Sequence, residues 1–198
     1  MKLPAKIRSV LTLLQERSPR GQMVRFAFFV VFYYFSRYPQ FFLNSHGNCE
    51  LLLTPIYKQL SFFITHVCCF VFRNFYPDIE SSLDHIIYIH GKPLIRFLPG
   101  CTGLEPMIRL TFILIFYPLL WRKKIVLWPI SMVILLFAAT LHFLLLILIS
   151  YHAPGWYNFA HNWLTRIIFY GFYFLCWLMW EKAIIFHSSR DLSRKLFS

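Results

Sequence analysis

Long uninterrupted runs of apolar residues mark the C-terminal half of the sequence. The runs at residues 103–121, 125–151 and 162–186 are each long enough to cross a bilayer as a helix, which takes about 20 mainly apolar residues. Polar segments separate them: the basic tripeptide 122–124 after the first run, and the loop 151–161 after the second. This pattern predicts three membrane helices joined by short loops.

The pattern in the N-terminal half is weaker. Residues 1–22 combine basic and apolar side chains and predict a short amphipathic helix on the membrane surface. Residues 23–43 are rich in aromatic side chains and predict a membrane helix, although Arg37 weakens its far end. Residues 51–76 contain an uncharged run, residues 60–72, that is short for a crossing.

Residues 77–100 follow a different pattern. Residues 85–90 contain isoleucine and tyrosine, which are good strand formers, and residues 94–98 are apolar again after Gly91 and Lys92. A glycine-containing turn between two such segments predicts a small β-hairpin outside the hydrocarbon.

Composition supports a membrane protein. Of the 198 residues, 58% are hydrophobic and 20% aromatic, while 14% are charged, against about 25% in a soluble domain. The net charge of +12 would also suit a protein that binds nucleic acid. However, the charges fall between the apolar runs, which favours loops at a membrane surface. We therefore expect the lipid bilayer, and no nucleic acid, as a partner.

The basic residues predict an orientation, because short loops rich in Lys and Arg stay in the cytoplasm. The N-terminal segment 1–22 and the tail 187–198 are basic, like the tripeptide 122–124. Both termini are therefore expected in the cytoplasm, with residues 23–186 as one transmembrane domain between them.

The number of crossings follows from this orientation. The segment before residue 103 is expected outside, so an odd number of crossings must separate it from the N-terminus. Residues 23–43 and 51–76 cannot then both cross. We prefer 23–43 as the crossing and assign 51–76 to an interfacial or re-entrant helix on the outer face. The expected fold is an all-α membrane protein of about four transmembrane helices, with the interfacial helix and the small β-hairpin outside.

Cys101 carries the clearest chemical signal, in the sequence Pro99-Gly100-Cys101-Thr102-Gly103. The flanking glycines leave the backbone accessible. The positive end of the following helix dipole favours the thiolate, which is the nucleophilic form of cysteine. The alternative is a buried, inert thiol.

Two histidines are candidate partners of this thiol. His161 starts the last predicted helix on the same expected face, where it can act as a general base or acid or, more simply, bind lipid headgroups. His142 lies eight residues before Ser150, or about 12 Å below the outer surface. Ionisable side chains inside a membrane usually face the bundle interior, so His142 either reaches the thiol or packs against a neighbouring helix.

Arg109 and Arg166 are candidate charge stabilisers for an oxyanion. Glu105 lies four residues before Arg109, so a helical ion pair is the simpler interpretation of that arginine. Cys101 and the candidate histidines lack the spacing of a helical metal site. We therefore expect neither a metal nor another cofactor.

Two segments resemble the exosortase/archaeosortase family. Residues 101–124, CTGLEPMIRLTFILIFYPLLWRKK, are similar to the family's active-cysteine segment. Residues 158–182, NFAHNWLTRIIFYGFYFLCWLMWEK, are similar to its histidine segment. The resemblance extends over residues 50–185.

The resemblance implies a bacterial inner-membrane cysteine protease or transpeptidase with Cys, Arg and His at the extracytoplasmic ends of its helices. Its substrates would be exported proteins with a C-terminal sorting tail, which consists of a short motif, a transmembrane helix and a basic end. The enzyme would cut near the motif and pass the acyl group to another acceptor. The resemblance assigns the cysteine to Cys101 and the histidine to His161.

The family's arginine does not carry over. Its Asn-x-x-Arg pattern aligns with Ala139-Thr140-Leu141-His142, where both polar positions differ. Either His142 or another arginine takes that role, or the chain is a catalytically impaired membrane subunit that binds a partner helix. A small transporter is a third alternative, although no internal repeat in the sequence supports it.

Overall fold

The computed structural model of the chain describes residues 18–36, 47–81, 86–96 and 102–196. The main elements are α2 (Pro19–Phe35), α4 (Gly47–Arg73), β1 (Ile79–Ser81), β2 (Ile86–Ile89), β3 (Lys92–Arg96), α5 (Leu104–Phe116), α6 (Trp121–His152), α7 (Tyr157–Phe159) and α8 (Thr165–Leu196). The amphipathic helix expected within residues 1–22 falls largely outside the described residues.

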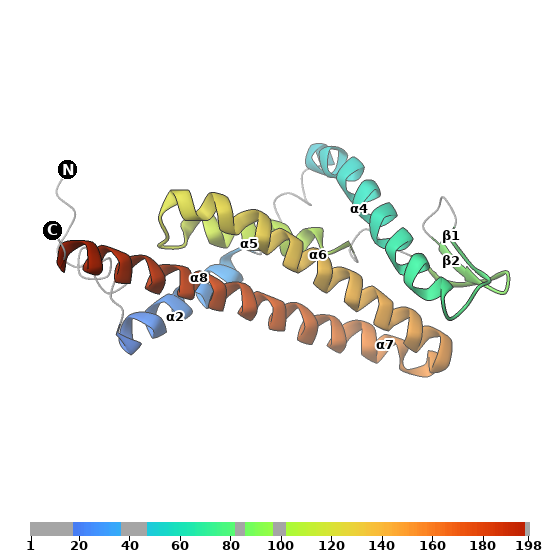
Figure 1. The fold of residues 1–198 in the computed structure, drawn as a ribbon. Helices are drawn as coiled ribbons and strands as arrows, with labels where there is room; N and C mark the ends of the chain where they lie inside the picture. Colours follow the sequence, from blue (N-terminus) through green and yellow to red (C-terminus); the bar gives the residue numbers. More distant parts are fainter. Residues whose placement is uncertain (1–17, 37–46, 82–85, 97–101, 197–198) are drawn as a thin grey trace.

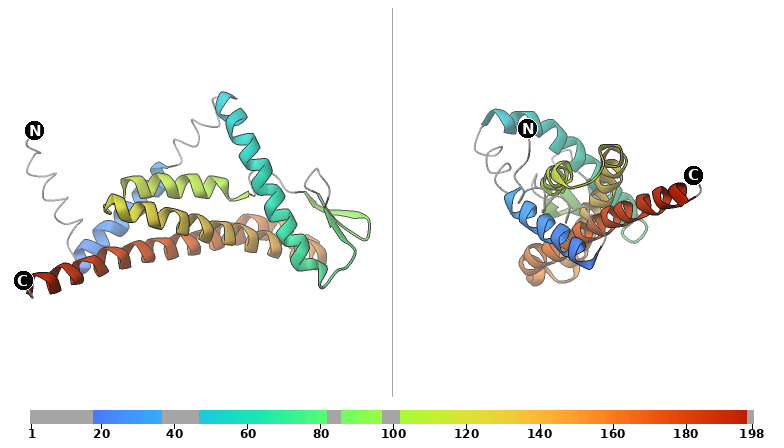
Figure 2. Two further views of the ribbon diagram at one scale, coloured as in Figure 1. Left: turned by 45° about the horizontal axis from the view of Figure 1, so that its top comes forward. Right: turned by 90° about the vertical axis from the view of Figure 1, so that its left-hand side faces the viewer.

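Two long antiparallel helices, α6 and α8, form the centre of the molecule (Figure 1). Buried positions recur every three or four residues along α6, so one stripe of this helix faces its neighbours. Those positions are Leu127, Ser131, Leu135, Ala138, Ala139, His142, Phe143, Leu146 and Ile147. Across the interface, Nε1 of Trp180 donates to Oγ of Ser131 over 3.1 Å. α5 packs along α6, and α4 lies at a steep angle to both long helices (Figure 2).

The two ends of this bundle differ. We term the end with residues 122–124 the basic end, and the opposite end, next to the β-sheet, the sheet end. At the basic end, a buried ion pair fixes α2 to α8: Arg25 Nε lies 2.7 Å from Glu181 Oε1, and Arg25 Nη2 lies 2.8 Å from Oε2. The phenol of Tyr117 also donates to this carboxylate. Such pairing is what allows charged groups to remain buried.

At the sheet end, the structure confirms the predicted hairpin. β2 and β3 pair antiparallel across a tight turn at His90 and Gly91, whose φ angles are 53° and 73°. Two consecutive positive φ angles are typical of two-residue hairpin turns. β1 pairs with β2 as a third strand, which the sequence analysis missed because three residues are too few to show a strand pattern. The hydroxyl of Ser150 donates to the carbonyl of Leu94 over 3.3 Å and joins the sheet to α6.

Three of the described helical segments are long and apolar enough to cross a membrane: Thr54–Arg73, Trp121–His152 and Pro154–Ile184. The protein is therefore mostly helical, with three helices apolar enough to span a bilayer and a small three-stranded sheet. The expected four crossings are not confirmed. By length and composition, Thr54–Arg73, within residues 51–76, qualifies as a span. α2 has 17 residues, and residues 37–43 of the expected crossing 23–43 lie outside the described residues, so the preference for 23–43 over 51–76 stays a prediction.

The predicted helix 103–121 is shorter in the structure. α5 has 13 residues, or about 20 Å, which is less than the hydrocarbon thickness. It stops at Phe116 because Pro118 follows, and the residue before a proline disfavours the α-conformation; Tyr117 accordingly has a ψ of 139°. The basic tripeptide 122–124, expected in a loop, forms the first turn of α6.

Candidate active site

A buried histidine lies at the interface between α6 and α8. His142 is 1% exposed, and its Nε2 lies 2.6 Å from Oγ1 of Thr165. The same hydroxyl donates to the backbone carbonyl of His161. A threonine hydroxyl has one proton, which this bond uses, so Nε2 of His142 must be the donor toward Thr165. In the neutral imidazole, Nδ1 of His142 then carries the lone pair.

His161 lies in the turn that leads into α8. Residues Ala160–Leu164 form a π-helical turn, a wide turn that shifts side chains out of the usual helical register and occurs often at functional sites. The ring centroids of His161 and His142 are 6.2 Å apart. Tyr157 stacks on His161: their ring centroids are 5.9 Å apart, and the angle between the ring planes is 4°. The turn thus brings the two imidazoles next to each other.

Both imidazoles keep an open nitrogen. Within the described residues, Nδ1 of His142 and Nδ1 of His161 are buried and have no hydrogen-bond partner. Buried polar atoms are nearly always paired, so an exception calls for a ligand, a water molecule or a reacting group. Two neighbouring imidazoles with open nitrogens can accept and return a proton.

The backbone that enters α5 lies against the same part of α6. Gly103 is the N-cap residue of α5 and has a φ of 73°. A Cβ added to Gly103 would lie 2.8 Å from Cβ of Ala139 and 3.6 Å from Cζ of Phe169. Ala139 precedes His142 by about one helical turn, and the rings of Phe169 and His142 are 6.0 Å apart. The start of α5 therefore meets α6 and α8 beside the histidines.

This meeting point lies well inside the bundle. His142 is ten residues before His152, where α6 ends, which corresponds to about 15 Å along the helix axis. Thr102 is fully buried, and its Oγ1 accepts a hydrogen bond from the backbone N–H of Leu104 over 3.3 Å. In Figure 1, α5 begins beside the middle of α6 and not at its end. A site here is recessed from the sheet end.

The structure brings two of the predicted site residues together and leaves the third undescribed. His142 and His161 are neighbours, although 19 positions separate them in the sequence. Cys101, the predicted nucleophile, lies outside the described residues. Thr102 and Gly103, which follow it, are both buried at the meeting point described above.

The candidate charge stabilisers have other neighbours. Arg109 forms the expected helical ion pair, with Nη2 3.7 Å from Oε2 of Glu105. Arg166 is exposed on α8, and its guanidinium lies 5.9 Å from the ring centroid of Trp163. Among the residues that the structure describes, no group of three or more His, Cys, Asp or Glu side chains could hold a metal ion.

The sequence analysis missed Thr165 and the π-helical turn. Thr165 is four residues after His161, a spacing at which a threonine hydroxyl in a helix reaches a preceding backbone carbonyl. The hydrogen bond from Thr165 to the carbonyl of His161 could therefore have been predicted from the sequence. The bond from Thr165 to His142 bridges 23 residues and depends on how α6 pairs with α8. No local sequence pattern predicts such a contact.

The fold and the site together describe a mostly helical protein with three helices apolar enough to span a membrane, in which a buried histidine, His142, lies next to a partly buried one, His161. Comparison of the chain with protein-family models, curated proteins and solved structures gives no match. Its function must therefore be inferred from its own residues.

Proposed function

We propose that the protein is a membrane cysteine peptidase or transpeptidase of exosortase type, which cleaves the C-terminal sorting tails of exported proteins. The observation that carries the proposal is the approach of Gly103 to Ala139 beside the open nitrogens of His142 and His161. Cys101 is two residues before Gly103, and two trans peptide units span at most about 7.6 Å. The Cα atom of Cys101 is thus held within about 7.6 Å of that of Gly103, and the proposal is that its thiol reaches the imidazole pair from there.

The proposed reaction is acyl transfer through a thioester. His161 takes the proton of the Cys101 thiol, and the thiolate adds to the scissile carbonyl. When the C–N bond breaks, the leaving amine takes that proton from His161, and the N-terminal part of the substrate remains on Cys101 as a thioester. An amine or water then attacks the thioester and gives a proton to His161, and the released thiolate takes this proton back from His161, which restores the enzyme.

The hydrogen bonds suggest the role of His142. Its aligned position corresponds to the charge-stabilising arginine of the family. In the neutral ring, however, Nε2–H is used by Thr165 and Nδ1 is an acceptor, which suits a thiol or an imidazole N–H better than an oxyanion. We therefore assign His142 to orienting the thiol or His161. Thr165 is a positioning residue, because it acts through His142.

The decisive experiment compares variants in a host where the wild-type chain gives detectable processing of a tail-bearing protein. Cys101→Ala removes the nucleophile and should lower processing more than about a thousandfold, with uncleaved substrate accumulating. Cys176→Ala is the matched control, because it removes a buried free thiol of α8. The catalytic proposal fails if Cys101→Ala processes substrate as well as Cys176→Ala does.

A second arm of this experiment tests the orienting role. Thr165→Val keeps the shape of the side chain but leaves Nε2 of His142 unpaired. It should lower kcat by up to about a hundredfold with little change in KM. Thr165→Ser keeps the hydroxyl and should restore kcat. Equal losses in both variants would point to a packing defect and contradict the orienting role.

One observation favours a different function. The Asn of the family pattern aligns with Ala139, which is fully buried, and Gly103 approaches so closely that a larger side chain has no room there. The second candidate is accordingly a catalytically impaired subunit that binds a partner transmembrane helix. In that case Cys101→Ala would leave the amount of the partner unchanged, whereas removal of the whole chain would lower it.

A further inference from the structure

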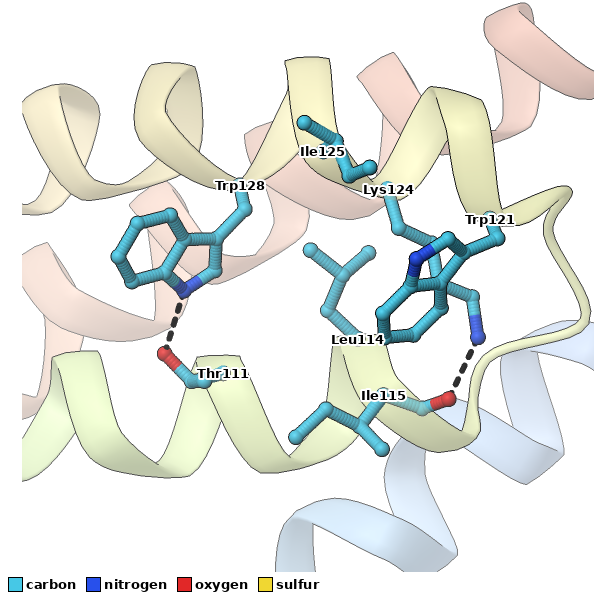
Figure 3. Close-up of a pocket in the computed structure, with 7 residues that line it drawn as sticks. All are labelled: Thr111, Leu114, Ile115, Trp121, Lys124, Ile125 and Trp128. Carbon is cyan, nitrogen blue, oxygen red and sulfur yellow. Dashed lines mark hydrogen bonds between the residues drawn. The ribbon is translucent and has the colours of Figure 1, made fainter.

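A cavity of about 250 Å³ opens between α5 and the first turns of α6, near the basic end (Figure 3). Apolar side chains such as Leu114 and Ile125 line most of it. Sites for whole small molecules enclose about 300–1,000 Å³. This cavity therefore suits a segment of a chain-like ligand, with the rest of the ligand outside.

Two tryptophans flank this cavity. Trp121 is 66% exposed and Trp128 is 46% exposed, and both extend from α6 over the cavity (Figure 3). Nε1 of Trp128 donates to Oγ1 of Thr111 over 2.9 Å, so this wall presents hydrocarbon to a ligand. Exposed tryptophans with an apolar ring and a bonded N–H are typical of membrane–water interfaces.

One cationic group also lines the cavity. Nζ of Lys124 donates to the carbonyl of Ile115 near the end of α5 and lies 5.8 Å from the ring centroid of Trp121. A lysine ammonium has three N–H donors, so it can bind an anionic oxygen while it keeps the bond to Ile115. The cavity thus combines an apolar interior with a cation beside an interfacial tryptophan.

The neighbouring charges point to an anion at the same place. Arg122, Lys123 and Lys124 lie in the first turn of α6, and this turn, which the structure describes completely, holds no acidic residue. The N-terminal end of a helix dipole favours negative charge, so the dipole would also stabilise an anion bound beside Lys124.

We propose that this cavity binds an anionic phospholipid, with part of one acyl chain between Trp121 and Trp128 and the phosphate at Lys124. The binding is independent of the proposed catalytic function. A partner helix is about 10 Å wide, so a cavity of about 250 Å³ is too small to seat one. Basic, tryptophan-flanked pockets between membrane helices suit anionic lipid headgroups.

The test measures lipid adducts on the purified full chain by native mass spectrometry, with equimolar phosphatidylglycerol and phosphatidylcholine in the micelles. The wild-type chain should prefer phosphatidylglycerol. Lys124→Gln should lower this preference about fivefold, the equivalent of about 1 kcal/mol for one cation at the membrane surface. Lys124→Arg should keep the preference. The matched control is Lys182→Gln, because Lys182 is an exposed lysine of α8 outside the cavity lining.

The apolar part of the site has its own variants. Trp128→Ala opens one wall and should lower the binding of both lipids, whereas Trp156→Ala, at a tryptophan 65% exposed in another part of the chain, should not. Before lipid binding is compared, thermal unfolding should give each variant the same melting temperature as the wild-type chain. Equal effects of Lys124→Gln and Lys182→Gln would indicate diffuse surface charge and overturn the proposal. A dimer that Trp128→Ala dissociates, with the binding of both lipids unchanged, would also overturn it in favour of a second copy on this face.

Discussion

Gly103 meets two separate restrictions at the candidate site. Its φ of 73° lies in the left-handed region, and a side chain there would contact Ala139 at 2.8 Å. Gly103→Ala should therefore lower the free energy of unfolding by roughly 3 kcal/mol, of which about 1 kcal/mol comes from φ and the remainder from overpacking. Denaturant-induced unfolding in micelles measures this change.

The hairpin turn provides the control for this prediction. Gly91 has the same φ of 73°, but nothing lies within 4 Å of a Cβ added to it. Gly91→Ala should therefore cost only the backbone part, about 1 kcal/mol. If both variants were equally stable, the close approach of α5 to α6 would be wrong, and with it the main support for the proposed site.

At the scale of single residues, the sequence showed which histidines to examine but not how they are bonded. His142 was a candidate because ionisable groups within a membrane face the bundle interior, and it is indeed buried. Its hydrogen bond to Thr165 depends on the relative rotation of two helices, which a single sequence does not contain. The position of Cys101 stays a prediction.

Among the helices, α2 is joined to α8 by a buried ion pair. Arg25 is fully buried and pairs with Glu181 through two nitrogens. Arg25→Met would leave a buried carboxylate without its cation and should lower the free energy of unfolding by about 3–5 kcal/mol. Thermal unfolding of the purified chain in micelles provides the measurement.

The double variant Arg25→Met/Glu181→Met separates the charge from the packing. Replacing both partners of a buried ion pair by apolar side chains is often neutral or stabilising, so most of the lost stability should return. A double variant as unstable as Arg25→Met alone would show that the contact holds α2 by shape and not by charge.

The elements were predictable where a local rule applies and were misplaced where two rules compete. The hairpin followed from β-branched residues around a glycine turn, and the structure confirms it. The helix end at Phe116 was missed because the apolar run continues past Pro118. The start of α6 was placed too late because basic residues usually mark loops, whereas here residues 122–124 begin a helix.

For the whole molecule, the distribution of charge makes the orientation in the membrane testable. If the basic end faces the cytoplasm, Lys92 in the sheet faces outward and Lys182 of α8 faces inward. A membrane-impermeant maleimide should then label Lys92→Cys in intact cells above the level of the wild-type chain. It should label Lys182→Cys only after the cells are permeabilised, and both positions are exposed in the structure.

The reverse labelling pattern would place the basic end outside. The recessed histidines would then open toward the cytoplasm, on the wrong side for exported substrates. Labelling of both positions in intact cells would mean that residues 121–184 do not cross the membrane as a pair, which would contradict the membrane assignment of α6 and α8.

The 32 residues of α6 have a consequence for the surrounding bilayer. At 1.5 Å per residue the helix is about 48 Å long, whereas the hydrocarbon layer is about 30 Å thick. The helix must therefore lean, project into the headgroups or locally thicken the lipid around it. Because α8 is packed against α6, the two helices lean together, so the tilt of the bundle becomes sensitive to the acyl-chain length of the host membrane.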